Sequence, residues 1–234
     1  MTGSYVRLEL ARALRNPVGM TMMTVFPLLL FLLWAEVLEV APPGRAMVSM
    51  ATYGAMGGAM FVGGAIAMER AGGWLRQLAV TPLPAHGYVT AKLLGAAAGV
   101  LPSVLVVLAA GALLAGVRLP AGTWAALVPL IWAGALPFAA LGVAFGYTFR
   151  GQLATLAMTI VYFALSVVGG LWVPVERMPS AMRALAEYSP TYQVGSLGWR
   201  ALEGRAPTGT SLAVLAAWTL GFVALALWRY RRAL

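Results

Sequence analysis

The sequence predicts an all-α integral membrane protein with six transmembrane helices. Hydrophobic residues make up 61% of the 234-residue chain and charged residues only 10%, whereas soluble domains average roughly 45–50% and about 25%. The mean hydropathy is +0.84, so lipid must replace water around much of the fold. A transmembrane helix needs about 20 mostly apolar residues. Six windows meet this requirement: Val18–Val40, Ala46–Met68, Tyr88–Val117, Thr123–Thr148, Leu153–Val173 and Thr210–Trp228.

The distribution of positive charge predicts how these six helices are oriented. With six spans both termini lie on one side, and that side carries ten of the sixteen Lys and Arg residues. Four of the other six lie in residues 174–209 together with three Glu residues, so this segment is nearly neutral. The positive-inside rule therefore places both termini in the cytoplasm of a multi-pass protein of the cell membrane (inner or plasma membrane). The net charge of +9 needs no nucleic-acid partner to explain it.

Composition also argues against catalytic and metal sites on this chain. The sequence has no Cys, one His (His86), and seven acidic residues that are all Glu, a poor supply of ligands for a zinc, iron or copper site. Lys92 is the only lysine, and no glycine-rich loop precedes it. Because a Walker A loop needs a Lys followed by Ser or Thr, we expect no ATPase motif, no catalytic residue, no metal site and no cofactor here.

The first sixteen residues predict an amphipathic helix. In "YVRLELARALR" the apolar residues Val6, Leu10 and Leu14 share one face and the charged residues point elsewhere, which suits a helix in the inner membrane interface. Pro17 disfavours helix at the residue before it, so this helix ends there. The alternative is a plain cytoplasmic start to the first span.

A polar insert separates the second and third windows. On a helix over Met68–Val80, Glu69, Arg70 and Arg76 fall on one side and Trp74, Leu75 and Leu78 on the other. The prolines of "TPLP" end this helix. Because the orientation above puts the insert in the cytoplasm, its apolar face needs a cover, which lipid headgroups or a protein groove would supply.

The stretch "MERAGGWLRQLAVTPLPAHGYVTAKLLGA" resembles the permease subunits of type-2 ABC transporters. That family carries a Glu-Arg pair, a glycine, a short Leu-rich helix and Thr-Pro before a Lys that opens the third span. The motif "RNP" before the first span, Pro27 within it, and "ERMPSAMRALAEYSPTY" before the last span fit as well. The resemblance covers the whole chain, 1–234, as one transmembrane domain. The double glycine Gly72-Gly73 departs from the family pattern and softens the insert helix.

This resemblance implies the membrane-spanning permease subunit of an ATP-driven exporter. Such a subunit moves a hydrophobic or amphipathic substrate (a drug, a lipid or a lipid-linked glycan) outward by alternating access. ATP and magnesium belong to a separate cytoplasmic ABC ATPase, and a second permease copy completes a homodimer or heterodimer in the bilayer. Residues 69–84 are then the coupling helix and turn that bind the ATPase. The implied coupling residues are Glu69, Arg70, Trp74, Leu75, Arg76 and Leu78.

Residues 174–208 predict two short external helices before the last span. The first has Met178, Met182 and Leu185 on one face, and the second starts at Ser189-Pro190 and stops at Gly204. We expect the second helix to dip into the outer leaflet, whereas the alternative for the segment is an inert surface loop. In the resembled family such helices form a lid over the exit path. The implied lid residues are Met182, Leu185, Tyr192 and Trp199.

The resemblance also implies a cleft lined by the second and fifth spans. The residues that these spans offer are Tyr53, Met56, Met60, Phe61, Tyr162 and Phe163. The alternative is that these side chains face lipid or neighbouring helices. Glu36 and Glu39, near the outer end of the first span, are either substrate-contacting or simply interfacial.

Glycine pairs at four-residue spacing predict close helix packing, either within the chain or at a dimer seam. The pairs are Gly54/Gly58, Gly95/Gly99 and Gly142/Gly146.

Two other classes of transporter remain open. A secondary transporter that works without ATP would show internal repeats and paired ionisable residues at mid-membrane, and the sequence has no convincing repeat. A cytochrome-maturation type ABC permease has a similar length but is expected to differ around the external helices.

Overall fold

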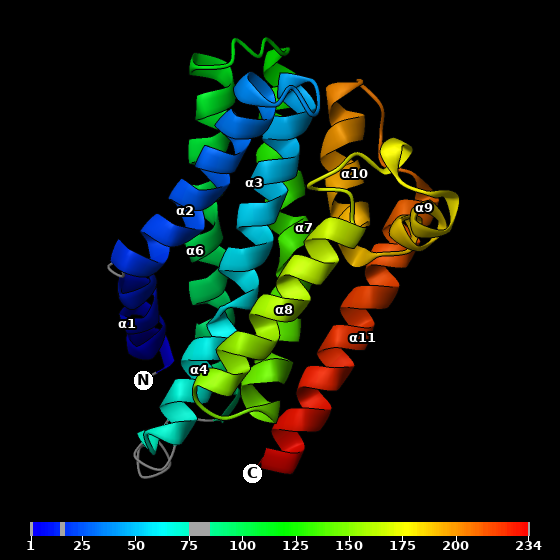
Figure 1. The fold of residues 1–234 in the computed structure, drawn as a ribbon. Coiled ribbons are helices and arrows are strands. Elements are labelled where there is room, and N and C mark those ends of the chain that lie inside the picture. Colours follow the sequence, from blue (N-terminus) through cyan, green and yellow to red (C-terminus); the bar gives the residue numbers. More distant parts are fainter. Residues whose placement is uncertain (1, 15–16, 75–84, 234) are drawn as a thin grey trace.

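The computed structural model describes residues 2–14, 17–74 and 85–233, and in these ranges the chain is helical with no strand. Figure 1 shows an elongated bundle with both termini at the same end. The α-helices are α1 (Thr2–Leu14), α2 (Pro17–Leu32), α3 (Pro43–Met60), α4 (Val62–Ala71), α6 (Ala85–Leu113), α7 (Ala121–Thr148), α8 (Gln152–Val168), α9 (Ser180–Glu187), α10 (Pro190–Leu202) and α11 (Gly209–Ala233). A π-helix, η1 (Leu33–Val37), extends α2, and a 3₁₀ turn, η2 (Val175–Arg177), precedes α9.

Four helical stretches are long and apolar enough to cross a membrane. They are Pro43–Ala71, which joins α3 and α4, Gly87–Leu113, Ala121–Thr148 and Gly209–Arg232. Two shorter apolar helices, Met23–Val37 and Gln152–Val168, lie in the first and fifth predicted windows. The all-helical class and four membrane-spanning candidates are therefore confirmed, while the count of six and the orientation stay predictions.

Helix α3 is the centre of the bundle. It packs against α2, α6 and α7, and between Ala46 and Met60 only Gly58 is not buried. By contrast, α11 packs on α7 and α10 along one side and is otherwise exposed, as its place at the edge of the bundle in Figure 1 shows. Its exposed apolar residues, such as Leu220, are suited to contact with lipid.

Glycines let α4 and α7 cross at backbone distance. A Cβ atom at Gly142 would overlap the carbonyl oxygen of Met60, and one at Gly63 would overlap that of Gly142. Since only hydrogen fits at such a crossing, the pair Gly142/Gly146 serves packing within the chain. Gly99, in contrast, has open space where its Cβ would be.

Two element-level predictions need correction. The helix predicted over Met68–Val80 is interrupted, because α4 ends at Ala71 and Gly73 has a φ of +76°, a left-handed conformation that glycine adopts without strain. Residues 75–84 lie outside the described residues. The N-terminal helix is present as α1, but Glu9 belongs to its buried face, whereas all charges were predicted to point away.

The segment before the last span is helical, as predicted. Both predicted helices are present as α9 and α10, so the inert-loop alternative is excluded. Helix α10 is buried between α3, α7 and α11, and its depth in the outer leaflet stays a prediction. Its N-cap is Ser189, whose hydroxyl accepts a hydrogen bond from the Tyr192 backbone N–H at 3.1 Å.

Candidate functional site

A buried ion cluster joins α1, α4 and α6 at the end of the bundle where α4 stops. Lys92 of α6, with only 4% of its side chain exposed, donates to Glu9 Oε2 at 2.9 Å and to Glu69 Oε1 at 2.6 Å. Tyr88, one turn earlier on α6, donates to Glu69 Oε2 at 2.6 Å. Arg12 donates to Glu9 Oε1 at 3.2 Å. Two carboxylates therefore face two cations, and Lys92 and Glu9 are buried while the Arg12 side chain is half exposed.

Helical spacing brings this cluster together. Tyr88 and Lys92 are four residues apart on α6, and Tyr5 and Glu9 are four apart on α1, so each pair shares a face. The rings of Tyr5 and Tyr88 lie 6.2 Å apart, centroid to centroid. Burial, followed by the nearby charge of Glu9, raises the pKa of Tyr5. Its phenol therefore stays neutral at physiological pH and adds no third negative charge.

The Glu-Arg pair of the predicted coupling element faces into the bundle. Glu69 is tied to Lys92 as described, and Arg70 donates to the Gly146 carbonyl of α7 at 2.7 Å and lies 5.2 Å from the Tyr147 ring. Trp74 is half-buried, with the Arg12 guanidinium 5.7 Å from its ring. The other three predicted coupling residues lie outside the described residues: Leu75, Arg76 and Leu78.

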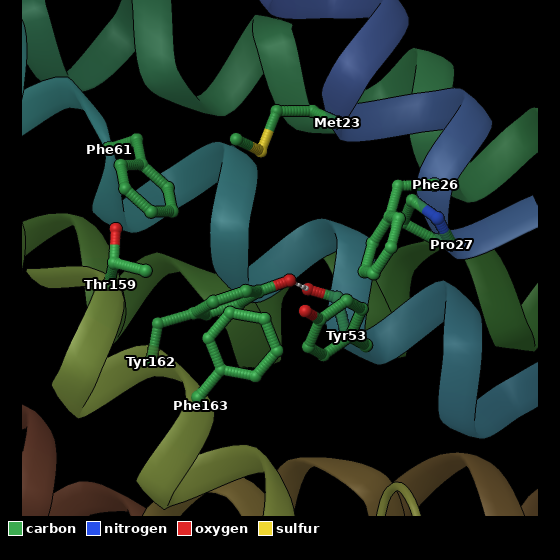
Figure 2. Close-up of a pocket in the computed structure, with 8 residues that line it drawn as sticks. All are labelled: Met23, Phe26, Pro27, Tyr53, Phe61, Thr159, Tyr162 and Phe163. Atoms are coloured by element: carbon green, nitrogen blue, oxygen red, sulfur yellow. Dashed lines mark hydrogen bonds between the residues drawn. The ribbon is translucent and has the colours of Figure 1, made fainter. Parts of the chain in front are cut away.

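An aromatic pocket of about 180 Å³ lies between α2, α3 and α8 (Figure 2). Each of the three helices contributes aromatic rings to the pocket, and Phe61, between α3 and α4, adds another. The ring centroids of Tyr53 and Tyr162 are 4.5 Å apart. The Tyr162 hydroxyl donates to the Tyr53 carbonyl at 2.9 Å, which fixes α8 against α3. The lining residues are Met23, Phe26, Pro27, Tyr53, Phe61, Thr159, Tyr162 and Phe163.

Four of the six predicted path residues therefore line one cavity: Tyr53, Phe61, Tyr162 and Phe163. Met56 and Met60 do not line it. Both are fully buried: the Met56 sulfur accepts a hydrogen bond from Thr191 of α10 at 3.5 Å, and Met60 lies at the α4–α7 crossing. The contribution of α2 was not predicted, because an all-apolar span gives no periodicity that tells which face meets a neighbour.

The predicted lid residues divide into two groups. Met182 and Leu185 of α9 are exposed, at 40% and 69%. Tyr192 is half-buried, and Trp199 is buried inside the bundle, where its indole N–H donates to Ser49 of α3 at 3.1 Å. Trp199 thus anchors α10 to α3. Whether any of them forms a lid stays a prediction.

An ion pair and a tryptophan hydrogen bond connect α3 and η1 with the segment between α8 and α9. Arg45 donates to Glu176 Oε1 at 2.8 Å. Burial works against ionisation of Glu176, but the hydrogen bond and charge of Arg45 outweigh it and lower the pKa of Glu176. The Trp34 indole N–H donates to the Trp172 carbonyl at 2.7 Å. Glu36 and Glu39 are exposed.

Metal chemistry gains no support from the described part of the chain. There, no three His, Cys, Asp or Glu residues lie close enough together to hold an ion.

Comparison with known proteins identifies the family. Residues 44–228 match the family described as "ABC-2 family transporter protein". The chain belongs to the ABC-2 transporter family. It is also 30% identical over 224 residues to the protein named "Putative transport permease YvfS" of Bacillus subtilis (strain 168), with 93% of this chain and 91% of that protein covered. The resemblance seen in the sequence is confirmed. Membership makes the chain a membrane permease subunit of an ABC transporter, which works with a partner ABC ATPase.

In this ABC-2 permease one helical rod connects the two sites. The rod α3–α4 carries Tyr53 and Phe61 in the pocket and Glu69 in the ion cluster. The two sites therefore lie on one stretch of chain, in which Phe61 is the turn residue between α3 and α4.

Proposed function

We propose that this chain is the permease subunit of an ATP-driven exporter that moves a hydrophobic or amphipathic substrate (a drug, a lipid or a lipid-linked glycan) outward by alternating access. The observation that carries the proposal is the α3–α4 rod, which ends in the ion cluster and passes the aromatic pocket on its way. In this proposal six spans cross the cell membrane and both termini are cytoplasmic. The position of both termini at one end of the bundle in Figure 1 supports an even number of spans.

A cytoplasmic ABC ATPase, which binds ATP and magnesium, docks on residues 69–84 in this proposal. Trp74, Leu75 and Leu78 provide the apolar contact and Arg76 the polar one. Glu69 and Arg70 hold the base of the docking segment to α6 and α7. Because Lys92 also holds Glu9, a movement of this base is shared with α1.

A second copy of the permease, or a similar chain, packs through α8. One face of α8 is buried and the opposite face carries an exposed apolar stripe with the alternating three- and four-residue spacing of a coiled-coil seam. The stripe consists of Leu153, Leu156, Ile160, Phe163 and Val167. Since Phe163 also lines the pocket, pairing along α8 brings the two pockets to a shared cleft. This geometry supports a transport path between two copies.

The position of the charges favours ATP-driven over ion-driven transport. Among the described residues the buried ionic groups gather at the end of the bundle, around Lys92, and the pocket is lined without charge. A carrier driven by an ion gradient is expected to place ionisable groups at its central site.

The experiment that tests the proposal is co-purification with the ABC ATPase. Truncation of a buried aromatic or aliphatic anchor at an interface costs about 2–4 kcal/mol, so Trp74→Ala and Leu78→Ala should each release the ATPase from the permease. Leu220→Ala, on the exposed side of α11, is the matched control and should leave the complex intact. Unchanged co-purification in both Trp74→Ala and Leu78→Ala would show that the ATPase docks elsewhere.

A further inference from the structure

The wall of the pocket is aromatic and uncharged. Five of its eight lining residues are aromatic. Apart from the two tyrosines among them, the only polar side chain in the lining is Thr159. Figure 2 shows Phe61, Tyr162, Phe163, Tyr53 and Phe26 gathered around one space. The wall therefore offers ring surface to a ligand and has no cation to attract an anionic group.

Two of the three hydroxyl groups of the wall, those of Thr159 and Tyr162, suit a cation better than an anion. Thr159 donates its proton to the Thr155 carbonyl at 2.9 Å, and Tyr162 donates to the Tyr53 carbonyl at 2.9 Å. Because each hydroxyl has a single proton to donate, these oxygens are left with lone pairs only. Phosphate and carboxylate groups need donors, whereas a positive group is stabilised by lone pairs.

The rings lie close enough to act together on a positive charge. The centroids of Tyr53 and Tyr162 are 4.5 Å apart, and those of Phe61 and Tyr162 are 5.6 Å apart. A cation within about 6 Å of a ring centroid is attracted by the negative face of the ring, more strongly where water is scarce. Quaternary ammonium groups are recognised in this way by cages of aromatic residues.

The volume limits what enters. The pocket, at about 180 Å³, is slightly larger than the cavity of about 150 Å³ that holds a benzene molecule. It therefore takes one ring or a head of trimethylammonium size, but not a polycyclic molecule as a whole. Phe26 and Phe163 are 41% and 38% exposed at its edge, so the apolar remainder of a ligand can leave toward the membrane.

A series of aromatic contacts leads from the pocket to η1, near which Glu36 and Glu39 are exposed. The Trp172 ring lies 5.7 Å from Tyr53 and 5.5 Å from Trp34, and Trp34 belongs to η1, where Glu36 is exposed, followed by Glu39. Arg45, a basic residue at this end, is neutralised by Glu176. Exposed negative charge near these aromatic contacts attracts cations to this end of the molecule.

We propose that the pocket binds a lipophilic cation, a quaternary ammonium or protonated amine group on an apolar chain or ring. As an assignment of the exporter's substrate class, it rests on the proposed function. As a binding site on this chain, it is tested without the ATPase.

The test measures equilibrium binding to the permease in nanodiscs of zwitterionic lipid. The probes are radiolabelled dodecyltrimethylammonium and its neutral analogue with a tert-butyl head of the same shape. We expect the cation to bind at least about tenfold more tightly. Phe26→Leu and Phe163→Leu remove one ring each at half-exposed positions, where folding is little affected, and should weaken cation binding about tenfold. Phe145→Leu, an aromatic substitution outside the pocket, should change nothing.

The outcomes separate this inference from the exporter proposal. Equal binding of the two probes, or equal losses for both in the leucine variants, overturns the cation assignment and leaves the exporter proposal standing. In the reconstituted complex with the ATPase, we expect the cation to stimulate ATP hydrolysis. Ring-dependent binding without stimulation supports the cation site and counts against export.

Discussion

At the scale of single residues, Lys92 makes the most consequential contacts among the described side chains. It is the sole lysine of the chain and neutralises carboxylates from two other helices. Removing one member of a buried ion pair leaves an uncompensated charge and costs about 3–5 kcal/mol. We therefore predict that Lys92→Met lowers the melting temperature of the purified permease strongly, as followed by circular dichroism in detergent.

Lys92→Arg is the control, because it keeps the charge and should cost clearly less. Adding Glu9→Gln and Glu69→Gln to Lys92→Met removes the unpaired charges and should recover part of the loss. A melting temperature unchanged in Lys92→Met would contradict the role given to the cluster.

The sequence indicated some of these residues and missed others for a physical reason. The aromatic character of Tyr53, Phe61, Tyr162 and Phe163 was visible because these residues occur in two apolar windows. The ion pair between Glu9 and Lys92 could not be predicted, because these positions are 83 residues apart in the sequence and no helical period relates them. A buried lysine in an apolar window was the available signal.

At the scale of elements, the crossing of α4 and α7 depends on glycine. A Cβ atom at Gly142 would overlap backbone atoms of Met60. Backbone atoms cannot move aside as the end of a flexible side chain can. We predict that Gly142→Ala forces the helices apart and destabilises the permease by about 1–3 kcal/mol, measured as a fall in melting temperature.

Gly99→Ala is the matched control, because nothing lies within 4 Å of the added methyl group. Alanine also favours helix over glycine by roughly 0.5–1 kcal/mol, so this variant should be neutral or slightly stabilised. Equal losses at both positions would mean that close packing is not what position 142 requires.

The helices themselves were largely predictable, whereas their environments were not. Each of the six apolar windows contains a helix, because continuous apolar sequence in lipid must satisfy its backbone internally. The burial of α10 within the bundle was not predicted, because Thr191, Gln193 and Ser196 give it polar composition. Local hydrogen bonds such as that from Ser196 to the Gln193 carbonyl, at 2.8 Å, allow these residues to be buried. The break after α4 occurs at Gly72-Gly73, where the left-handed conformation of Gly73 outweighs the amphipathic pattern.

At the scale of the whole molecule, orientation in the membrane is the first matter to measure. The chain contains no cysteine, so single cysteines can be placed at will and tested on intact cells with a membrane-impermeant thiol reagent. We predict labelling at Ser180→Cys and Thr208→Cys and protection at Gln77→Cys and Gly151→Cys. External labelling at position 77 would reverse the orientation and remove the proposed ATPase docking site.

Coupling between the ATPase and the pocket is the central claim, and a distance between two helices that line the pocket tests it most directly. Spin labels at Leu29→Cys of α2 and Ala164→Cys of α8, both exposed, report this distance by double electron–electron resonance in the complex with the ABC ATPase. We predict that trapping ATP on the ATPase shifts the distance distribution, and that Leu78→Ala abolishes the shift. A distribution that stays the same with and without ATP, while the ATPase remains bound, would contradict the claim.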